Sequence, residues 1–149
     1  MNPQDLTERI DRAIDARSDL LNGDQTTAIR LFNGFSEGCP DLLIDLYART
    51  LVLAAPEVMQ QILESIQAHL LRRLPQVNCV IQKMRASHDL KRRRGIMTFG
   101  NNPATQIQEL MIWYAVDLMM NQDASLYLDT RNLRKWLLEN AAGCFIMWL

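Results

Sequence analysis

The chain has 149 residues, of which 48% are hydrophobic and 22% charged, and its formal net charge is −1. This composition excludes a disordered chain, and the length suits one ordinary domain with a real core. No apolar run approaches the ~20 residues of a membrane span, and residues 1–8 carry acids where an export signal carries a basic region. We therefore expect a soluble, cytoplasmic protein in which Cys39, Cys79 and Cys144 are reduced thiols that pack as small apolar groups.

The first half of the chain predicts two helices and a small sheet. Helical spacing of apolar residues predicts a helix from Pro3 to about Asn22, with Leu6, Ile10, Ala13, Ile14, Leu20 and Leu21 on its inner face. A second helix is expected from Pro56 to Leu74, with Val58, Ile62, Ile66 and Leu70 facing inward. Short apolar runs bounded by turn residues predict strands at 28–33, 41–47, 50–54 and 77–84.

The second half begins with a basic loop around residues 91–94 and a short strand at 96–99. The apolar run from Ile107 to Met120 predicts one long buried strand, although its periodicity alone does not exclude a helix, and Ser125–Leu128 is its expected partner strand. Asp129 or Thr130 is expected to cap a last helix that ends at Gly143, with inward positions Leu133, Trp136 and Leu137. The whole pattern predicts an α+β fold.

Two segments of the chain resemble one enzyme family. Residues Glu37-Gly-Cys-Pro-Asp-Leu-Leu-Ile-Asp45 are similar to an acidic-Gly-x-Pro-x-Leu-hydrophobic-Val/Ile-Asp signature, except that Asp41 replaces a common Gly. Glu109, Trp113-Tyr-Ala-Val-Asp117 and Asp123-Ala-Ser-Leu-Tyr-Leu-Asp-Thr-Arg131 resemble the segment that leads into the catalytic domain, with Met111 where Gly is usual. These features are typical of class I S-adenosylmethionine-dependent RNA methyltransferases of the ribosomal-RNA type.

The resemblance implies that the chain consists of three segments. They are an N-terminal helix (1–25), a small α+β domain like a substrate-recognition domain (26–105), and a hairpin, helix and first strand (106–149) that lead into a methyltransferase domain. Cys144–Leu149 would be that first strand, left without neighbours and available for self-association. The chain would then be truncated before the catalytic domain.

The resemblance also implies S-adenosylmethionine as cofactor. In this family the cofactor cleft would be lined at Tyr127, Asp129, Arg131 and Arg134. The same residues also fit structural roles, with Asp129 as a helix cap, Tyr127 as a half-buried strand residue, and the two arginines as a solvated pair. The glycine-rich turn and the ribose-binding acid expected in such a fold are absent from the sequence, so we expect the chain alone to be catalytically silent.

A second feature is local positive charge. Six cations between residues 83 and 94 are candidates for RNA phosphate binding: Lys83, Arg85, Lys91, Arg92, Arg93 and Arg94. A solvated loop explains such a run equally well. His69 and His88 have no carboxylate or cysteine at ligand spacing, so no metal site is predicted.

The sequence therefore leads to one main hypothesis and two alternatives. The main hypothesis is the N-terminal part of an RNA methyltransferase, which places the RNA substrate. The alternatives are an autonomous module that binds RNA or a protein partner, and a truncated gene product without independent function.

Overall fold

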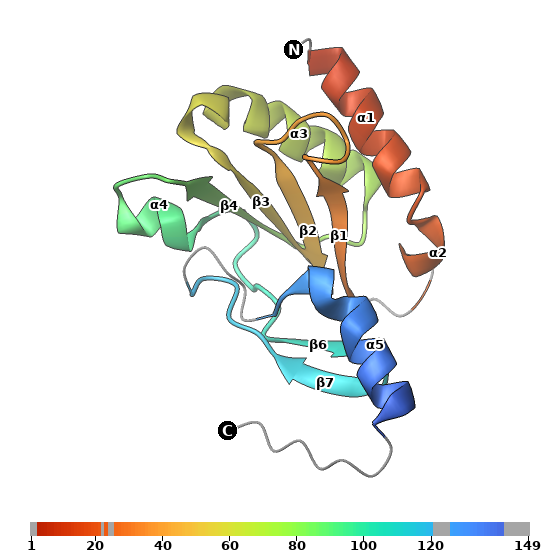
Figure 1. Ribbon diagram of the computed structural model, residues 1–149. Helices are drawn as coiled ribbons and strands as arrows, with labels where there is room; N and C mark the ends of the chain where they lie inside the picture. Colours follow the sequence, from red (N-terminus) through yellow and green to blue (C-terminus); the bar gives the residue numbers. More distant parts are fainter. Residues whose placement is uncertain (1–2, 22, 24–25, 121–125, 142–149) are drawn as a thin grey trace.

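The computed structural model describes residues 3–21, 23, 26–120 and 126–141, and it shows the predicted α+β fold (Figure 1). The helices are α1 (Pro3–Asp15), α2 (Ser18–Leu21), α3 (Gln60–Arg73), α4 (Leu90–Arg94) and α5 (Arg131–Asn140), with 3₁₀ turns η1 (Glu57–Met59) and η2 (Leu128–Thr130). The strands are β1 (Ala28–Asn33), β2 (Leu43–Tyr47), β3 (Thr50–Pro56), β4 (Cys79–Arg85), β5 (Ile96–Phe99), β6 (Gln106–Glu109) and β7 (Ile112–Ala115). No described helix is long and apolar enough to cross a bilayer.

The first five strands form one sheet in the order β1-β2-β3-β4-β5, and β6 and β7 form a separate hairpin. Strands β3 and β4 are parallel and connected through α3, whereas the other neighbours in the sheet are antiparallel. Strand β1 has an irregular register between Arg30, which pairs with Asp45, and Phe32, which pairs with Ile44. This bulge allows the consecutive residues Leu31 and Phe32 both to be fully buried in the same core.

The two faces of the sheet have different coverings. Helices α1 and α3 pack on the first face, where Ile10, Leu63 and Leu70 meet sheet residues such as Leu51 and Leu53. On the second face, a smaller apolar core joins the sheet to the β6–β7 hairpin and η2 through Tyr47, Val52, Cys79, Ile81, Ile107, Val116, Leu118 and Leu128. Beyond this core, the second face borders a pocket.

The predicted first helix is interrupted near its end. It breaks after Asp15, and α2 begins at Ser18. The side chain of Arg17 donates to the Ala13 carbonyl at 2.7 Å and pairs with Glu37 at 2.6 Å. The first turn of the predicted second helix is the 3₁₀ turn η1, so Val58 is 88% exposed and Leu63 supplies the buried position instead.

The apolar run from Ile107 to Met120 is not one strand. It folds into the β6–β7 hairpin, with Leu110 (φ 53°) and Met111 (φ 67°) at the turn. Both residues have the left-handed backbone of a tight hairpin turn, which normally selects Asn or Gly, so the sequence gives no turn signal here. The expected partner strand is also wrong, because Leu128 opens η2 and Leu126 is not in a strand. Ser125 lies outside the described residues.

Two further predictions need correction. Residues 90–94 form helix α4 rather than a loop, because the Asp89 carboxylate accepts a hydrogen bond from the Lys91 amide at 2.8 Å and caps the helix. Leu133 and Trp136 of α5 do not face inward and are 56% and 57% exposed. Gly143 and the predicted strand Cys144–Leu149 lie outside the described residues.

Candidate functional site

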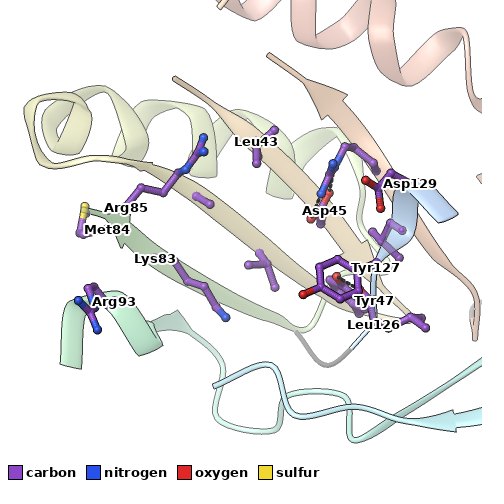
Figure 2. Close-up of a pocket in the computed structure, with 14 residues that line it drawn as sticks. Leu43, Asp45, Tyr47, Lys83, Met84, Arg85, Arg93, Leu126, Tyr127 and Asp129 are labelled. Carbon is purple, nitrogen blue, oxygen red and sulfur yellow. Dashed lines mark hydrogen bonds and ion pairs between the residues drawn. The ribbon is translucent and has the colours of Figure 1, made fainter. Parts of the chain in front are cut away.

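A pocket of about 250 Å³ lies on the open part of the second sheet face (Figure 2). Its floor comes from β1 to β4, and its walls come from α4 and from residues 126–129. Strand alternation positions the polar floor, since residues two apart on one strand point to the same face. The polar and aromatic lining residues are Arg30, Asp45, Tyr47, Lys83, Arg85, Arg93, Tyr127 and Asp129.

Arg30 and Asp45 form an ion pair across β1 and β2 in the floor. Their atoms approach to 2.8 Å (Nε to Oδ1) and 3.2 Å (Nη2 to Oδ2), and Asp45 is 9% exposed. Burial raises the pKa of the Asp45 carboxyl, while the Arg30 guanidinium opposes this rise and Lys83 opposes it more weakly. The hydrogen bond from Arg30 to Asp45 likewise raises the arginine pKa. The charges of this pair therefore largely neutralise each other.

The remaining cations of the pocket are Lys83 and Arg85 of β4 and Arg93 of α4. Lys83 is 2% exposed, whereas Arg85 is exposed at the end of its strand. The Nε of Arg93 is buried and has no hydrogen-bond partner among the described residues. Gly95 (φ 118°) brings α4 close to β4, because a Cβ there would lie 2.6 Å from Ile81 Cγ2.

The six predicted RNA-binding residues thus divide into two groups. Lys83, Arg85 and Arg93 line the pocket. Arg92 instead forms an ion pair with Glu57 and lines a different hollow beside α3 and β5. Lys91 and Arg94 are exposed on α4.

The four predicted cofactor-lining residues divide as well. Arg134 Nε donates to Glu109 Oε2 at 2.6 Å, and Arg131 Nε lies 3.5 Å from Glu109 Oε1. The Glu109 side chain is 0% exposed, so the idea of a solvated arginine pair is wrong. Tyr127 and Asp129 are exposed residues of the pocket wall instead, and neither caps α5. The N-cap position is Thr130, but its hydroxyl donates to the Tyr127 carbonyl at 2.8 Å.

The pocket chemistry does not fit S-adenosylmethionine. That molecule carries a sulfonium and an ammonium against one carboxylate, and the pocket presents four cations against two carboxylates. The parallel pair β3 and β4 also lacks a glycine-rich turn, since the sequence has no glycine between Gly38 and Gly95. In the described part of the chain, no three His, Cys, Asp or Glu side chains gather at a site for a metal ion.

Sequence reasoning missed Arg30, Asp45 and Tyr47 as site residues. A usable signal existed for Arg30 and Asp45, because each is the only charged residue within an apolar strand. A charge in the middle of a buried strand requires a partner or a polar cavity. Tyr47 gave no comparable signal, since tyrosine is common in strands.

The comparisons with solved structures identify the class of protein that shares this fold. A protein from Streptococcus mutans, proposed to be a SAM-dependent methyltransferase, matches 95% of this chain with a TM-score of 0.79 and 23% identity. The structure of SMU.776, a proposed methyltransferase complexed with SAH, matches 95% with a TM-score of 0.80 and 23% identity. This chain covers 37% of each of those chains, and at this identity the likeness shows the fold alone.

A sequence comparison finds similarity to a ribosomal-RNA methyltransferase. The chain is 30% identical over 137 residues to ribosomal RNA large subunit methyltransferase I of Shewanella frigidimarina (strain NCIMB 400). The match includes 87% of this chain and 34% of the relative, so the chain spans about a third of that protein's length. The predicted resemblance to SAM-dependent ribosomal-RNA methyltransferases is thus confirmed over part of such a protein. No protein-family model matches the chain.

Proposed function

We propose that this chain is the RNA-placing part of a SAM-dependent ribosomal-RNA methyltransferase. One observation carries the proposal. Three cations that the sequence predicts as RNA ligands, Lys83, Arg85 and Arg93, lie in one pocket with Tyr127 of the family-like segment. Two independent sequence features therefore meet at one site, on a chain similar to part of a ribosomal-RNA methyltransferase.

The chemistry of this site suits a polyanion. Arginine guanidinium groups match phosphate oxygens geometrically and form charge-assisted hydrogen bonds with them. Arg93 has a buried Nε without a partner in the described part of the chain, and an incoming phosphate oxygen satisfies such a group. Contacts of this kind release counterions from RNA, so the affinity falls as salt rises.

In this proposal the chain contributes placement and not methyl transfer. S-adenosylmethionine does not bind at the pocket, because the excess positive charge there repels a cationic ligand. The cofactor is bound by residues other than those of this pocket. The chain by itself is then catalytically incompetent.

The test is RNA affinity as a function of salt, measured by fluorescence anisotropy. The double variant Arg85→Ala/Arg93→Ala removes two pocket cations, and Arg12→Ala/Arg72→Ala removes two exposed cations elsewhere, on α1 and α3. We expect the slope of log affinity against log salt to flatten by about 1–1.5 in the pocket variant, and to stay near the wild-type slope in the control. Equal slopes in all three proteins contradict the proposal.

The two alternative functions predict different results in the same binding experiment. An autonomous RNA-binding module binds ribosomal and unrelated RNA equally and keeps the pocket dependence. A chain without independent function retains no RNA even at low salt. Preference for a large-subunit ribosomal RNA fragment over unrelated RNA of equal length supports the placement role.

A further inference from the structure

We propose that the pocket on the open sheet face binds one single-stranded nucleotide of the RNA, with the phosphate beside Lys83, Arg85 and Arg93 and the base against Tyr127. This inference rests on the proposed RNA-placing function and names its contact site. The cavity of about 250 Å³ is small for a ligand site, which favours a single nucleotide over a base pair.

The phosphate end follows from the distribution of charge. Arg30 is neutralised by its two hydrogen bonds to Asp45 and contributes little net attraction. The guanidinium groups of Arg85 and Arg93 lie at the other end of the pocket, on β4 and α4, where the buried Arg93 Nε has no partner among the described residues. An anion at this end gains both the Coulomb attraction and a hydrogen bond to Arg93.

The opposite end of the pocket repels phosphate. Asp129 is exposed on η2, and its charge acts on both Arg30 and Asp45. Figure 2 shows Arg93 on one side of the pocket, and Asp45, Asp129 and Tyr127 together on the other. The charge gradient thus orients a bound nucleotide, with its phosphate toward α4 and its base toward η2.

Tyr127 presents an exposed aromatic ring on a backbone that is held by hydrogen bonds. Its side chain is 64% exposed, but its carbonyl accepts hydrogen bonds from Thr130 Oγ1 and Arg134 Nη1, each at 2.8 Å. Arg134 is in turn fixed by Glu109. The backbone of Tyr127 is therefore held in place while its ring remains open, and exposed aromatic rings are the usual partners of unpaired bases.

The experiment compares a single-stranded RNA with an abasic oligonucleotide of equal length, which keeps the phosphates and lacks the bases. Tyr127→Leu should weaken binding of the base-bearing RNA by about tenfold and leave the abasic binding unchanged. Tyr127→Phe should restore the loss, because phenylalanine keeps the stacking ring. Trp113→Leu is the matched control, since Trp113 is 52% exposed on β7 and does not line the pocket.

The proposed phosphate contact at Arg93 is tested by a separate measurement, the salt dependence of binding. Arg93→Gln should weaken both oligonucleotides alike and lower the salt slope by about one. Photocross-linking of the wild-type chain to RNA, with the adduct mapped by mass spectrometry, tests Tyr127 without any substitution. An adduct on Tyr127 supports the site even if Tyr127→Leu folds poorly.

The inference is overturned if wild-type protein binds RNA and the Tyr127→Leu variant binds it equally well. It is also overturned if Tyr127→Leu weakens the binding of abasic and base-bearing RNA by the same factor. An adduct that maps only outside the pocket also overturns it. In these cases the RNA-placing function survives, since wild-type binding persists. Failure of the wild-type chain to bind either oligonucleotide overturns the proposed function as well.

Discussion

Glu109 on β6 and Arg134 on α5 are joined by a 2.6 Å hydrogen bond across 25 residues of sequence, and the glutamate side chain is completely buried. Arg134 also donates through Nη1 to the Tyr127 carbonyl and to Thr130 Oγ1. One buried carboxylate therefore ties α5 and the residues before it to the β6–β7 hairpin. This connection determines where Tyr127 lies at the pocket.

We predict that Glu109→Ala lowers the free energy of unfolding by about 3 kcal/mol, because it leaves Arg131 and Arg134 without their buried counter-charge. Urea unfolding followed by circular dichroism measures the change. Lys135→Ala is the control, since it breaks an exposed pair with Glu139, and it should cost about 0.5 kcal/mol or less. A similar small effect in both variants would mean that the Glu109 pair is structurally unimportant.

We predict that Arg30→Gln destabilises the protein at neutral pH by about 2 kcal/mol, because it leaves Asp45 as an unpaired buried carboxylate. Burial raises the Asp45 pKa above its ordinary value of 3.8, so the folded state holds the proton more tightly than the unfolded state. The stability of the variant is therefore highest in acid and falls as pH rises through the folded pKa.

The defect of Arg30→Gln relative to wild type should accordingly grow from pH 4 to pH 7. Thermal unfolding at several pH values measures it. The double variant Arg30→Gln/Asp45→Asn removes the titrating group. The difference in stability between this variant and wild type should therefore grow much less between pH 4 and pH 7. A defect that is constant with pH in the single variant would show that Asp45 is not its origin.

We predict that Met111→Gly stabilises the protein by about 0.5–1 kcal/mol, because a left-handed residue costs about 1–2 kcal/mol unless it is glycine. Met111 has φ 67° and is 86% exposed, so loss of its side chain removes little packing. Met97→Gly is the matched control on β5, where glycine should lower stability by a similar amount. Unfolding midpoints that shift in the same direction would contradict the explanation.

We predict that the chain does not bind S-adenosylmethionine appreciably, because its pocket carries excess positive charge. Isothermal titration calorimetry should show no saturable heat. A dissociation constant near micromolar, about −8 kcal/mol of binding free energy, would require a cofactor site that the described residues do not provide.

The sheet could be predicted well where local signals are strong. The predicted strand at 28–33 coincides with β1, because its apolar residues are bounded by polar and turn residues. The split of the run Ile107–Met120 could not be predicted, since its turn residues Leu110 and Met111 are not turn formers. Long-range contacts fix that hairpin instead, including a hydrogen bond from the Gln108 amide to the Thr26 carbonyl at 2.9 Å.

The residues of the candidate site could likewise be predicted from the sequence only in part. Lys83, Arg85 and Arg93 are close in sequence, so their gathering was predictable from a local excess of charge. Arg30 and Tyr127 reach the pocket from opposite ends of the chain, and only strand pairing and the hairpin bring them together. The charge inside β1 and the family-like segment mark these two residues separately, but their meeting in one pocket depends on tertiary structure that no local pattern encodes.

The bulge between Arg30 and Phe32 has a consequence for how this gene can change over evolutionary time. Side chains alternate between the faces of a sheet, so deletion of a paired residue of β1 would move the side chains on one side of the deletion to the other face. Shifting in that way would place Arg30 against α1 or bring Phe32 into the polar pocket. Loss of Leu31 is different, because it pairs with no residue of β2 and its removal would leave Arg30 opposite Asp45 and Phe32 opposite Ile44. Length variation within residues 28–33 among descendants of this chain should therefore be confined to the position of Leu31, whereas substitutions can occur at the other positions of β1.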